Sequence, residues 1–403
     1  MKILSLTYEY PPIGGGGSVV ASALNQTLVH FGDEVEVVTS AMKGLERDTT
    51  AGGVRIHRTT CWRRHRHYTT TPELVTTLLP AYLRAEQVIR RFQPDLIHTH
   101  FVIPSGAIAA ALGRRFDLPY VITAHGSDIP GYNPDRFRLM HALVHPLWRR
   151  IMRGAALVTS PSHYLEGLIH DHIDVPVTVI PNGYTPAPRL GRKKRNLVLV
   201  VTRLFPRKGV QHFLDAIRDL PGDWEFVVAG DGPYLPTLQR QARRLGVPVR
   251  FTGFVDRMTL RGLYEEARIM VFPSVRENFP IVLLEGMDAG CAIITTDDDG
   301  CSEVIGQAGV TVPRGGSTGI RRALERLMAD RAECERLGAL ARERARSFRW
   351  PMVAQRFRRA YAQVLGRPAP EDPRISDLGA TGVFDSRFVD RLVNPAAATP
   401  MRR

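Results

Sequence analysis

The chain has 403 residues, of which 44% are hydrophobic, and this length exceeds what one ordinary hydrophobic core accommodates. The composition excludes a chain that is disordered throughout, and the formal net charge of +14 suits anionic ligands or an anionic membrane surface. The basic stretches lack interleaved aromatic residues and a nucleic-acid-binding motif, so nucleic acid is not expected as a partner. We therefore expect two domains and a tail.

No run of about 18 apolar residues appears, and the chain start lacks the layout of a signal peptide, so the sequence predicts neither a spanning helix nor export. The four cysteines are scattered without zinc or redox spacing, and we expect them to be reduced. A cytoplasmic protein is the resulting expectation.

Short apolar runs alternate with longer amphipathic stretches, a pattern typical of β-α-β units and mostly parallel sheets. The first set of predicted strands comprises residues 2–7, 34–39, 54–58, 95–99, 119–124, 156–160 and 177–180. After a stretch rich in proline and basic residues, the second set comprises residues 197–202, 225–229, 249–252, 269–273, 292–295 and 310–312. Because the strand pattern begins again after this stretch, the sequence predicts two doubly wound sheets. Sheets of this kind bind ligands at the carboxyl ends of their strands.

Residues 316–365 are predicted to be helical throughout, and turn residues without periodicity follow them. The predicted parts of the chain are, in order, a first Rossmann-like domain (1–184), a linker (185–196), a second Rossmann-like domain (197–350), a C-terminal helix returning toward the first domain (351–366), and a mainly disordered tail (367–403) with a short docking piece near residues 384–393.

Four consecutive glycines, Gly14 to Gly17, precede a helix that is predicted to begin near Ser18 as its N-cap. A backbone without side chains can pass close to a ligand, and N–H groups at a helix start attract anions. A flexible surface turn is the alternative, and the loop does not fit the dinucleotide-binding fingerprint. Gly230 begins a second loop of this kind after the strand at 225–229.

Basic side chains follow the strand at 197–202. Arg203 offers a planar fork to phosphate oxygens and Lys208 a compact charge, and together they can neutralise a departing diphosphate without a metal. Arg207 competes for this role, and a solvated loop also explains either residue alone.

The most specific feature is a pair of carboxylates, Glu277 and Glu285, separated by seven residues just past an apolar strand. Pro280 suits the first turn of a helix, which puts Glu277 on the approaching loop and Glu285 inside the helix. The carboxylates suit hydroxyl groups, and the free N–H groups between them suit phosphates. The alternative interpretation is that Glu277 and Glu285 are exposed surface residues without a binding role.

His125 ends the strand at 119–124, and Asp128 follows three residues later. A histidine at a strand end can donate to a sugar hydroxyl or to a developing charge, although a structural role is the alternative. His98 and His100 alternate at another strand end without an evident third ligand, so no metal site is expected there.

The order of these motifs resembles retaining glycosyltransferase family 4, also called glycosyltransferase group 1, over about residues 1–365. The matching pieces are the glycine-rich first loop, HGSD, IPNGY (180–184), TRLFPRKG, AGDGP (229–233), FTGFV (251–255) and the element from Glu277 to Glu285. The resemblance implies an α/β protein of the GT-B fold, with two Rossmann-like domains facing across a cleft and C-terminal helices. It implies that the first domain (1–184) lies on the acceptor side and that the second (197–350) binds the donor nucleotide. It also implies retaining, metal-independent transfer from a UDP- or GDP-linked sugar to a glycan, lipid or small-molecule acceptor, with no cofactor.

The resemblance further implies roles for individual residues. Arg203 and Lys208 look like the pair that supports departure of the diphosphate, which itself accepts the acceptor's proton. Glu277 and His125 look like the carboxylate and the histidine beside the transferred sugar. The implied donor-binding positions are Glu285 at the ribose, the backbone of Asn278, Phe279, Pro280 and Ile281 at the sugar and phosphates, Gly15 and Gly16 near the phosphates and acceptor, and Gly230.

Two departures from the family pattern bear on sugar or acceptor choice. Four glycines stand where a glycine and a small polar residue are more familiar, and Asn278-Phe279 stands where smaller residues are common. A sugar-nucleotide epimerase of the same fold and a catalytically inactive, sugar-nucleotide-binding scaffold subunit are the alternative functions.

Residues 61–68 combine Trp62 and Tyr68 with the arginines Arg63, Arg64 and Arg66, as interfacial segments do. This segment is either a peripheral contact with the anionic inner face of the cell membrane or a solvent-exposed loop. A membrane contact predicts that replacing the three arginines weakens binding to anionic vesicles.

Overall fold

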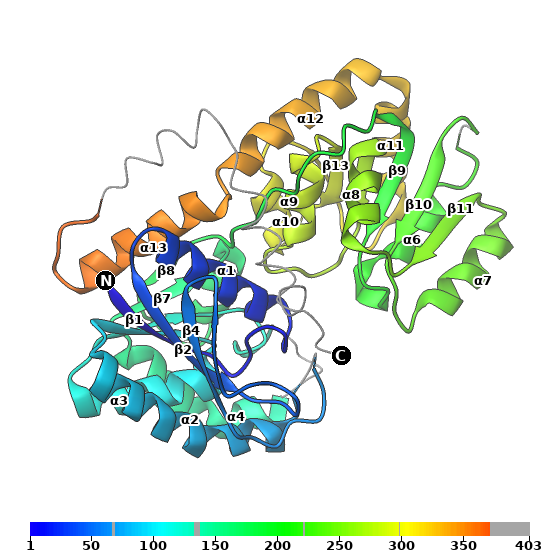
Figure 1. The fold of residues 1–403 in the computed structure, drawn as a ribbon. Helices are drawn as coiled ribbons and strands as arrows, with labels where there is room; N and C mark the ends of the chain where they lie inside the picture. Colours follow the sequence, from blue (N-terminus) through cyan, green and yellow to red (C-terminus); the bar gives the residue numbers. More distant parts are fainter. Residues whose placement is uncertain (67–68, 133–137, 221, 298, 371–403) are drawn as a thin grey trace, which may run out of the picture. The chain divides into compact units, whose positions relative to one another are not determined.

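The computed structural model describes residues 1–66, 69–132, 138–220, 222–297 and 299–370. The chain divides into two compact units, one formed by Met1–Gly183 with Trp350–Arg403 and the other by Tyr184–Arg349 (Figure 1). The predicted tail from residue 371 onward, with its docking piece, lies outside the described residues. Within the described ranges, no helix combines the length and apolar character needed to cross a membrane.

A largely parallel sheet forms the centre of the first unit. Its strands are β1 (Lys2–Leu6), β2 (Glu34–Ser40), β3 (Asp48–Ala51), β4 (Val54–Thr59), β5 (Leu96–His100), β6 (Tyr120–Thr123), β7 (Leu157–Ser160) and β8 (Val177–Val179). Their order is β3-β4-β2-β1-β5-β6-β7-β8, and only the β3–β4 pair is antiparallel. The predicted strands of this half are present, with shifted ends.

Helices cover both faces of this sheet (Figure 1). On one face, α1 (Gly16–His30) packs against α13 (Trp350–Val364). The other face carries one apolar cluster with helices α2 (Thr71–Phe92), η1 (Val102–Gly106, a π-helix), α3 (Ala107–Phe116), α4 (Arg138–Gly154) and α5 (His163–His170). The layered arrangement follows from strands that alternate with amphipathic helices.

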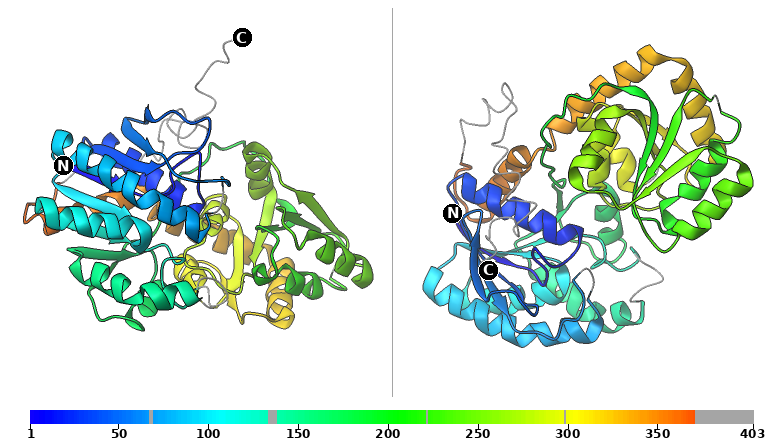
Figure 2. Two further views of the ribbon diagram at one scale, coloured as in Figure 1. Left: turned by 90° about the horizontal axis from the view of Figure 1, so that it is seen from below. Right: turned by 45° about the vertical axis from the view of Figure 1, so that its right-hand side comes forward.

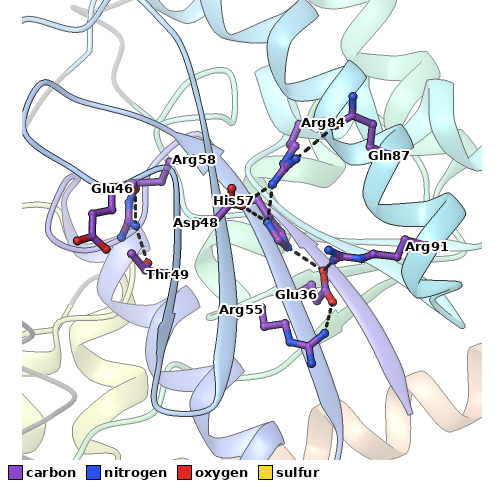
Figure 3. A network of polar contacts seen from close by, with 10 residues as sticks. All are labelled: Glu36, Glu46, Asp48, Thr49, Arg55, His57, Arg58, Arg84, Gln87 and Arg91. Carbon is purple, nitrogen blue, oxygen red and sulfur yellow. Dashed lines mark hydrogen bonds and ion pairs between the residues drawn. The ribbon is translucent and has the colours of Figure 1, made fainter.

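Strand β3 has no counterpart among the predicted strands, because its four residues contain no apolar run. A polar network fastens this edge of the sheet instead (Figure 3). The ring of His57 on β4 lies between two carboxylates, with Nδ1 2.5 Å from Asp48 and Nε2 2.8 Å from Glu36. Arg84 and Arg91 of α2 pair with the same two carboxylates. Charge pairing distant in sequence therefore holds a strand that local patterning does not reveal.

The second unit contains a wholly parallel sheet. Its strands are β9 (Arg195–Val201), β10 (Glu225–Ala229), β11 (Val249–Gly253), β12 (Ala267–Phe272), β13 (Ala292–Thr296) and β14 (Val310–Val312). Their order is β11-β10-β9-β12-β13-β14. All of these strands were expected from their apolar runs, and β9 takes in the last two residues of the predicted linker.

The helices of this unit are η2 (Pro206–Lys208, a 3₁₀ turn), α6 (Val210–Ala216), α7 (Leu235–Leu245), α8 (Arg257–Glu266), α9 (Ile281–Asp288), α10 (Asp299–Ile305), α11 (Ser317–Ala329) and α12 (Arg331–Arg346). They lie on both faces of the sheet (Figure 2). Helices α8, α9 and α10 share one apolar cluster, and α6, α7 and α11 share the other. The predicted helical stretch at 316–365 is in fact three helices, with breaks before α12 and before α13.

Two arginines of α12 have partners within the fold. Arg342 of α12 donates to the last backbone carbonyls of α9, and Arg344 donates to those of α10. Cations stabilise the ends of helices where carbonyl groups lack backbone partners. These two arginines therefore stabilise the second unit.

Candidate active site

A buried ion pair joins Lys208, the last residue of η2, to Glu277 in the loop that follows β12. Their side chains are only 10% and 14% exposed. The hydroxyl group of Ser274 donates to the same carboxylate oxygen of Glu277 at 2.7 Å. Burial lowers the pKa of Lys208, and the charge of Glu277 opposes this shift. The carboxylate therefore helps to keep a buried cation protonated.

Sheet topology brings these two loops together. Strands β9 and β12 are parallel neighbours, so the loops at their carboxyl ends leave the same edge of the sheet. The N–H group of Val275 donates to the carbonyl oxygen of Arg207 at 2.9 Å. A Cβ atom on Gly209 would lie 1.9 Å from the carbonyl oxygen of Pro273, so only glycine permits this approach.

Replacing Gly209 with alanine is expected to destabilise the second unit by about 2–4 kcal/mol, because its φ of +70° and the Pro273 contact both exclude a side chain. Gly315→Ala is a matched control: its φ is +72°, and no described atom lies within 4 Å of an added Cβ. The control is expected to lose only about 1–2 kcal/mol. Thermal unfolding measures both, and equal losses would contradict the proposed contact.

Arg203 and Arg207 are exposed on the loop that carries Lys208. The guanidinium of Arg203 lies 5.8 Å from the ring centre of Phe205, and Arg207 donates to the backbone carbonyl of Arg276 at 3.4 Å. The positive charges of both arginines lower the pKa of Lys208 further, after burial. The loop therefore concentrates positive charge, with Lys208 as its buried member.

The segment after Glu277 leads into α9, which begins at Ile281. Pro280 occupies the position before the helix, so its predicted place within the first turn is wrong by one residue. Phe279 is buried, and its ring centre lies 5.6 Å from that of Phe348. The side chain of Phe279 therefore belongs to the core, whereas its backbone belongs to the loop.

A glycine on α10 fixes the backbone of this segment. The N–H group of Gly300 donates to the carbonyl oxygen of Glu277 at 2.9 Å. A Cβ atom on Gly300 would lie 1.5 Å from the carbonyl oxygen of Asn278. The close approach holds the start of α9 in place.

Glu285 lies on α9 beside a small pocket that Arg257 also lines. The hydroxyl group of Tyr264 on α8 donates to the carboxylate of Glu285 at 2.9 Å. Burial raises the pKa of Glu285, and this hydrogen bond opposes the shift. A half-buried carboxylate held in this way suits the hydroxyl groups of a ligand.

Gly230 supports the loop that carries Arg203. Its φ is +138°, and an added Cβ would lie 1.9 Å from the carbonyl oxygen of Thr202. Its own N–H group donates to the carbonyl oxygen of Gly253 at 3.0 Å. The requirement for glycine at this position is explained by backbone packing.

In the first unit, the half-buried His125 follows β6. Its Nε2 lies 3.0 Å from Nδ1 of His100, and its ring centre lies 4.6 Å from that of Phe101. Asp128 accepts hydrogen bonds from the N–H groups of His125 and Gly126 at 3.0 and 2.9 Å, which fixes the turn. Burial lowers the pKa of His125 to about 4, so the ring is neutral near pH 7.

The start of α1 differs from the prediction. The helix begins at Gly16 with Gly15 as its N-cap, so the prediction that Ser18 is the N-cap is wrong. The hydroxyl of Ser18 donates to the carbonyl oxygen of Ile13 at 2.7 Å. The buried carboxylate of Glu9 accepts from the N–H groups of Gly15 and Ser18, and burial raises its pKa. A carboxylate of the chain itself thus faces the positive end of α1.

The glycines of this loop have two different environments. A Cβ on Gly14 would lie 2.7 Å from Cβ of Glu9, and one on Gly17 would lie 2.5 Å from the ring of Phe101. No described atom lies within 4 Å of a Cβ added to Gly15 or Gly16. Packing therefore requires the outer two glycines, whereas the inner two leave backbone exposed.

Comparison with known proteins defines the class. The Anabaena protein HepE, solved in complex with UDP, matches with a TM-score of 0.73 and 20% sequence identity, covering 90% of this chain and 100% of HepE. Together with the two parallel-rich sheets covered by helices, this likeness shows that the protein has the GT-B fold.

Two family models match consecutive parts of the chain, Glycosyltransferase Family 4 over residues 14–187 and Glycosyl transferases group 1 over residues 186–344. The chain is 28% identical over 410 residues to glycogen synthase of Mycobacterium tuberculosis, covering 93% of this chain and 98% of that protein. It is 29% identical over 283 residues to phosphatidyl-myo-inositol mannosyltransferase of Mycobacterium leprae, covering 67% and 74%. The chain belongs to glycosyltransferase family 4.

Proposed function

We propose that the protein is a retaining glycosyltransferase that moves a sugar from a nucleoside-diphosphate sugar to a glycan, lipid or small-molecule acceptor without a metal or cofactor. The observation that carries this proposal is the buried Lys208–Glu277 pair at neighbouring strand ends. The complex of HepE with UDP supports a nucleoside-diphosphate donor, and we propose one that is linked to UDP or GDP. The name of the mannosyltransferase relative supports a lipid among the candidate acceptors.

The reaction must stabilise negative charge on a departing diphosphate and positive charge on the sugar. Lys208 and Arg203 are proposed to neutralise the diphosphate, and Glu277 to stabilise the oxocarbenium-like sugar. The bond between the anomeric carbon and the phosphate oxygen breaks, and the acceptor oxygen bonds to the same face of that carbon. The acceptor hydroxyl gives its proton to the departing diphosphate.

The remaining predicted residues are proposed to bind substrate. Glu285 accepts hydrogen bonds from ribose hydroxyls, and the backbone of residues 278–281 contacts the sugar and phosphates at the start of α9. In the first unit, His125 donates to the substrate, and Gly15 and Gly16 let the backbone approach it closely. We propose only a supporting role for Gly230, through its contact with Thr202.

Hydrolysis of the donor in the presence of EDTA tests both the stereochemistry and the metal independence. Proton NMR is expected to show the released sugar first in the donor's own anomeric configuration, before mutarotation, at a rate that EDTA leaves unchanged. The opposite anomer as the first product would contradict retention, and loss of turnover with EDTA would contradict metal independence.

A second proposal rests on the outer surface of the first unit. Val75, Leu79 and Leu83 repeat every four residues along one face of α2 and are 61%, 66% and 49% exposed. Trp62 is 52% exposed, and its backbone N–H group donates to the hydroxyl of Thr76, the residue after Val75, at 3.0 Å. We call Trp62, Val75, Leu79 and Leu83 the apolar stripe; exposed apolar groups in such a row mark interaction surfaces.

Basic residues are present in the layer that carries the apolar stripe, although α2 itself also holds Glu73 and Glu86. Helices α3 and α4 share the layer of α2 and contain arginines but no acidic residue. The guanidinium of Arg64 lies 4.6 Å from the ring centre of Trp62. Arg63, by contrast, donates to three backbone carbonyls and shapes its own loop. We propose that the stripe, rather than the basic loop alone, contacts the anionic inner face of the cell membrane.

Replacing Leu79 and Leu83 together with serine is expected to weaken binding to vesicles that contain phosphatidylglycerol by about tenfold or more, because apolar burial in the interface is lost. Leu340→Ser, which changes a leucine of α12 that is 44% exposed, is the matched control and should bind like the unchanged protein. Sedimentation with vesicles measures both. Equal vesicle binding by all three proteins would contradict the membrane contact. If the unchanged protein were an oligomer and only the double variant a monomer, the stripe would instead be a self-association surface.

A further inference from the structure

A pair of neutral histidines lies at the carboxyl ends of β5 and β6. His100 ends β5 and is fully buried, and its Nδ1 lies 3.0 Å from Nε2 of His125. The two rings are stacked, with centres 5.3 Å apart and 24° between their planes. Burial lowers the pKa of both rings, so each carries one ring proton near neutral pH. One of the two facing nitrogens must therefore donate and the other accept.

The neighbouring His98 does not take part in this choice, because its own hydrogen bonds are fixed in direction. Thr159 donates its hydroxyl proton to the carbonyl oxygen of Ile122, so the Thr123 hydroxyl is the donor in the Thr123–Thr159 hydrogen bond. Thr123 then accepts from Nε2–H of His98 at 2.8 Å.

The second nitrogen of His98 is also occupied. Its Nδ1 accepts from the hydroxyl group of Tyr361 on α13 at 2.8 Å. Both nitrogens of His98 thus have partners, and neither is available to His100. His98 therefore does not set the hydrogen-bond direction within the His100–His125 pair.

The buried Nε2 of His100 decides the direction. Among the described residues, no hydrogen-bond partner lies within reach of this atom. If Nε2 carried the proton of His100, a buried N–H donor would be left without an acceptor, which is rare and unfavourable in proteins. If Nδ1 carries the proton, only a lone pair is left without a partner, and Nδ1–H donates to His125. The second arrangement satisfies the only donor of the ring.

We infer that His100 is a positioning residue that holds His125 as its Nδ1–H tautomer. Nε2 of His125 is occupied as an acceptor, so His125 serves the substrate as a hydrogen-bond donor and not as a base through Nε2. This inference rests on the proposed transfer reaction. The inferred tautomer is consistent with transfer of the acceptor's proton to the departing diphosphate, because Nε2 of His125 already accepts a hydrogen bond and cannot accept that proton.

Long-range proton–nitrogen NMR correlation on the full chain with labelled histidine reads the tautomer directly, and the His125 signals are identified by their loss in His125→Gln. The expected pattern for His125 is a proton on Nδ1. His100→Phe should move that proton toward Nε2, and His100→Asn should keep it on Nδ1, because the carboxamide N–H takes the place of the ring donor. A proton on Nε2 in the unchanged protein would overturn the inference, as would an unchanged pattern in a folded His100→Phe.

Kinetics give a second readout. His100→Phe is expected to lower kcat by about 10-fold to 100-fold with little change in donor KM, and His100→Asn to restore most of the loss, by analogy with groups that orient a functional histidine. A loss that His100→Asn does not restore would contradict the assigned hydrogen bond. The NMR result does not depend on turnover, so failure of the proposed reaction and failure of this inference are distinguishable.

Discussion

Replacing Lys208 with methionine is expected to lower kcat/KM for sugar transfer by about 100-fold to 1,000-fold, the effect of removing one preorganised charge from a site where charge develops. Methionine keeps most of the side-chain volume, so the packing around η2 is retained. The remaining positive groups of the loop, Arg203 and Arg207, are exposed and cannot reproduce a buried charge that faces Glu277. The binding of free nucleoside diphosphate should weaken in parallel.

Steady-state kinetics and calorimetric nucleotide binding measure these effects. Lys193→Met removes an exposed lysine of the same unit and is expected to leave both unchanged. Thermal unfolding separates loss of charge from loss of fold. A Lys208→Met protein that folds normally and retains activity within a few-fold of the unchanged protein would exclude Lys208 from diphosphate departure.

Changing Glu277 to glutamine is expected to produce a loss of similar size together with an altered pH profile. The carboxamide keeps the position of the side chain and a hydrogen bond to Ser274, but it removes the negative charge. The pKa of Lys208, already lowered by burial, then loses the interaction that raises it. Because the protonated lysine is the form proposed to act on the diphosphate, the alkaline limb of kcat/KM should move to lower pH.

The pH dependence of kcat/KM measures this shift. Glu225→Gln removes a carboxylate from an exposed ion pair with Arg195 and serves as the control, with an unchanged profile expected. If Glu277→Gln lowered the rate without moving the alkaline limb, the carboxylate would act on the substrate and not through Lys208. An unchanged rate would contradict both roles.

Apolar runs bounded by turn residues predicted the strands because the centre of a parallel sheet is buried on both faces. Strand β3 was not predicted because it has no apolar run. The contact of its Asp48 with His57 on the neighbouring strand stabilises it instead. The prediction that Ser18 is the N-cap of α1 was wrong for a related reason: the carboxylate of Glu9, upstream of the glycines, interacts with the N–H groups of Gly15 and Ser18 at the start of the helix. Local sequence propensity does not reveal a side chain that reaches a strand or helix end only after the chain has folded.

Each residue of the predicted site stands in its own short motif, and only the structure shows the contacts among them. Lys208 and Glu277 are separated by 69 positions and meet because β9 and β12 are adjacent. Tyr264, which hydrogen-bonds Glu285, carries no motif of its own. The partner of His98 is Tyr361, on a helix 263 residues later. Sequence patterns predicted candidate site residues but not the side chains that hold them in place.

The most direct test of the account is nucleotide release from UDP-, GDP- and ADP-sugars without added metal, compared among the unchanged protein, Lys208→Met and Glu277→Gln. The account predicts release from one donor class by the unchanged protein and near-complete loss in both variants. Absence of turnover and of nucleotide binding across the panel would contradict it and favour a catalytically inactive subunit.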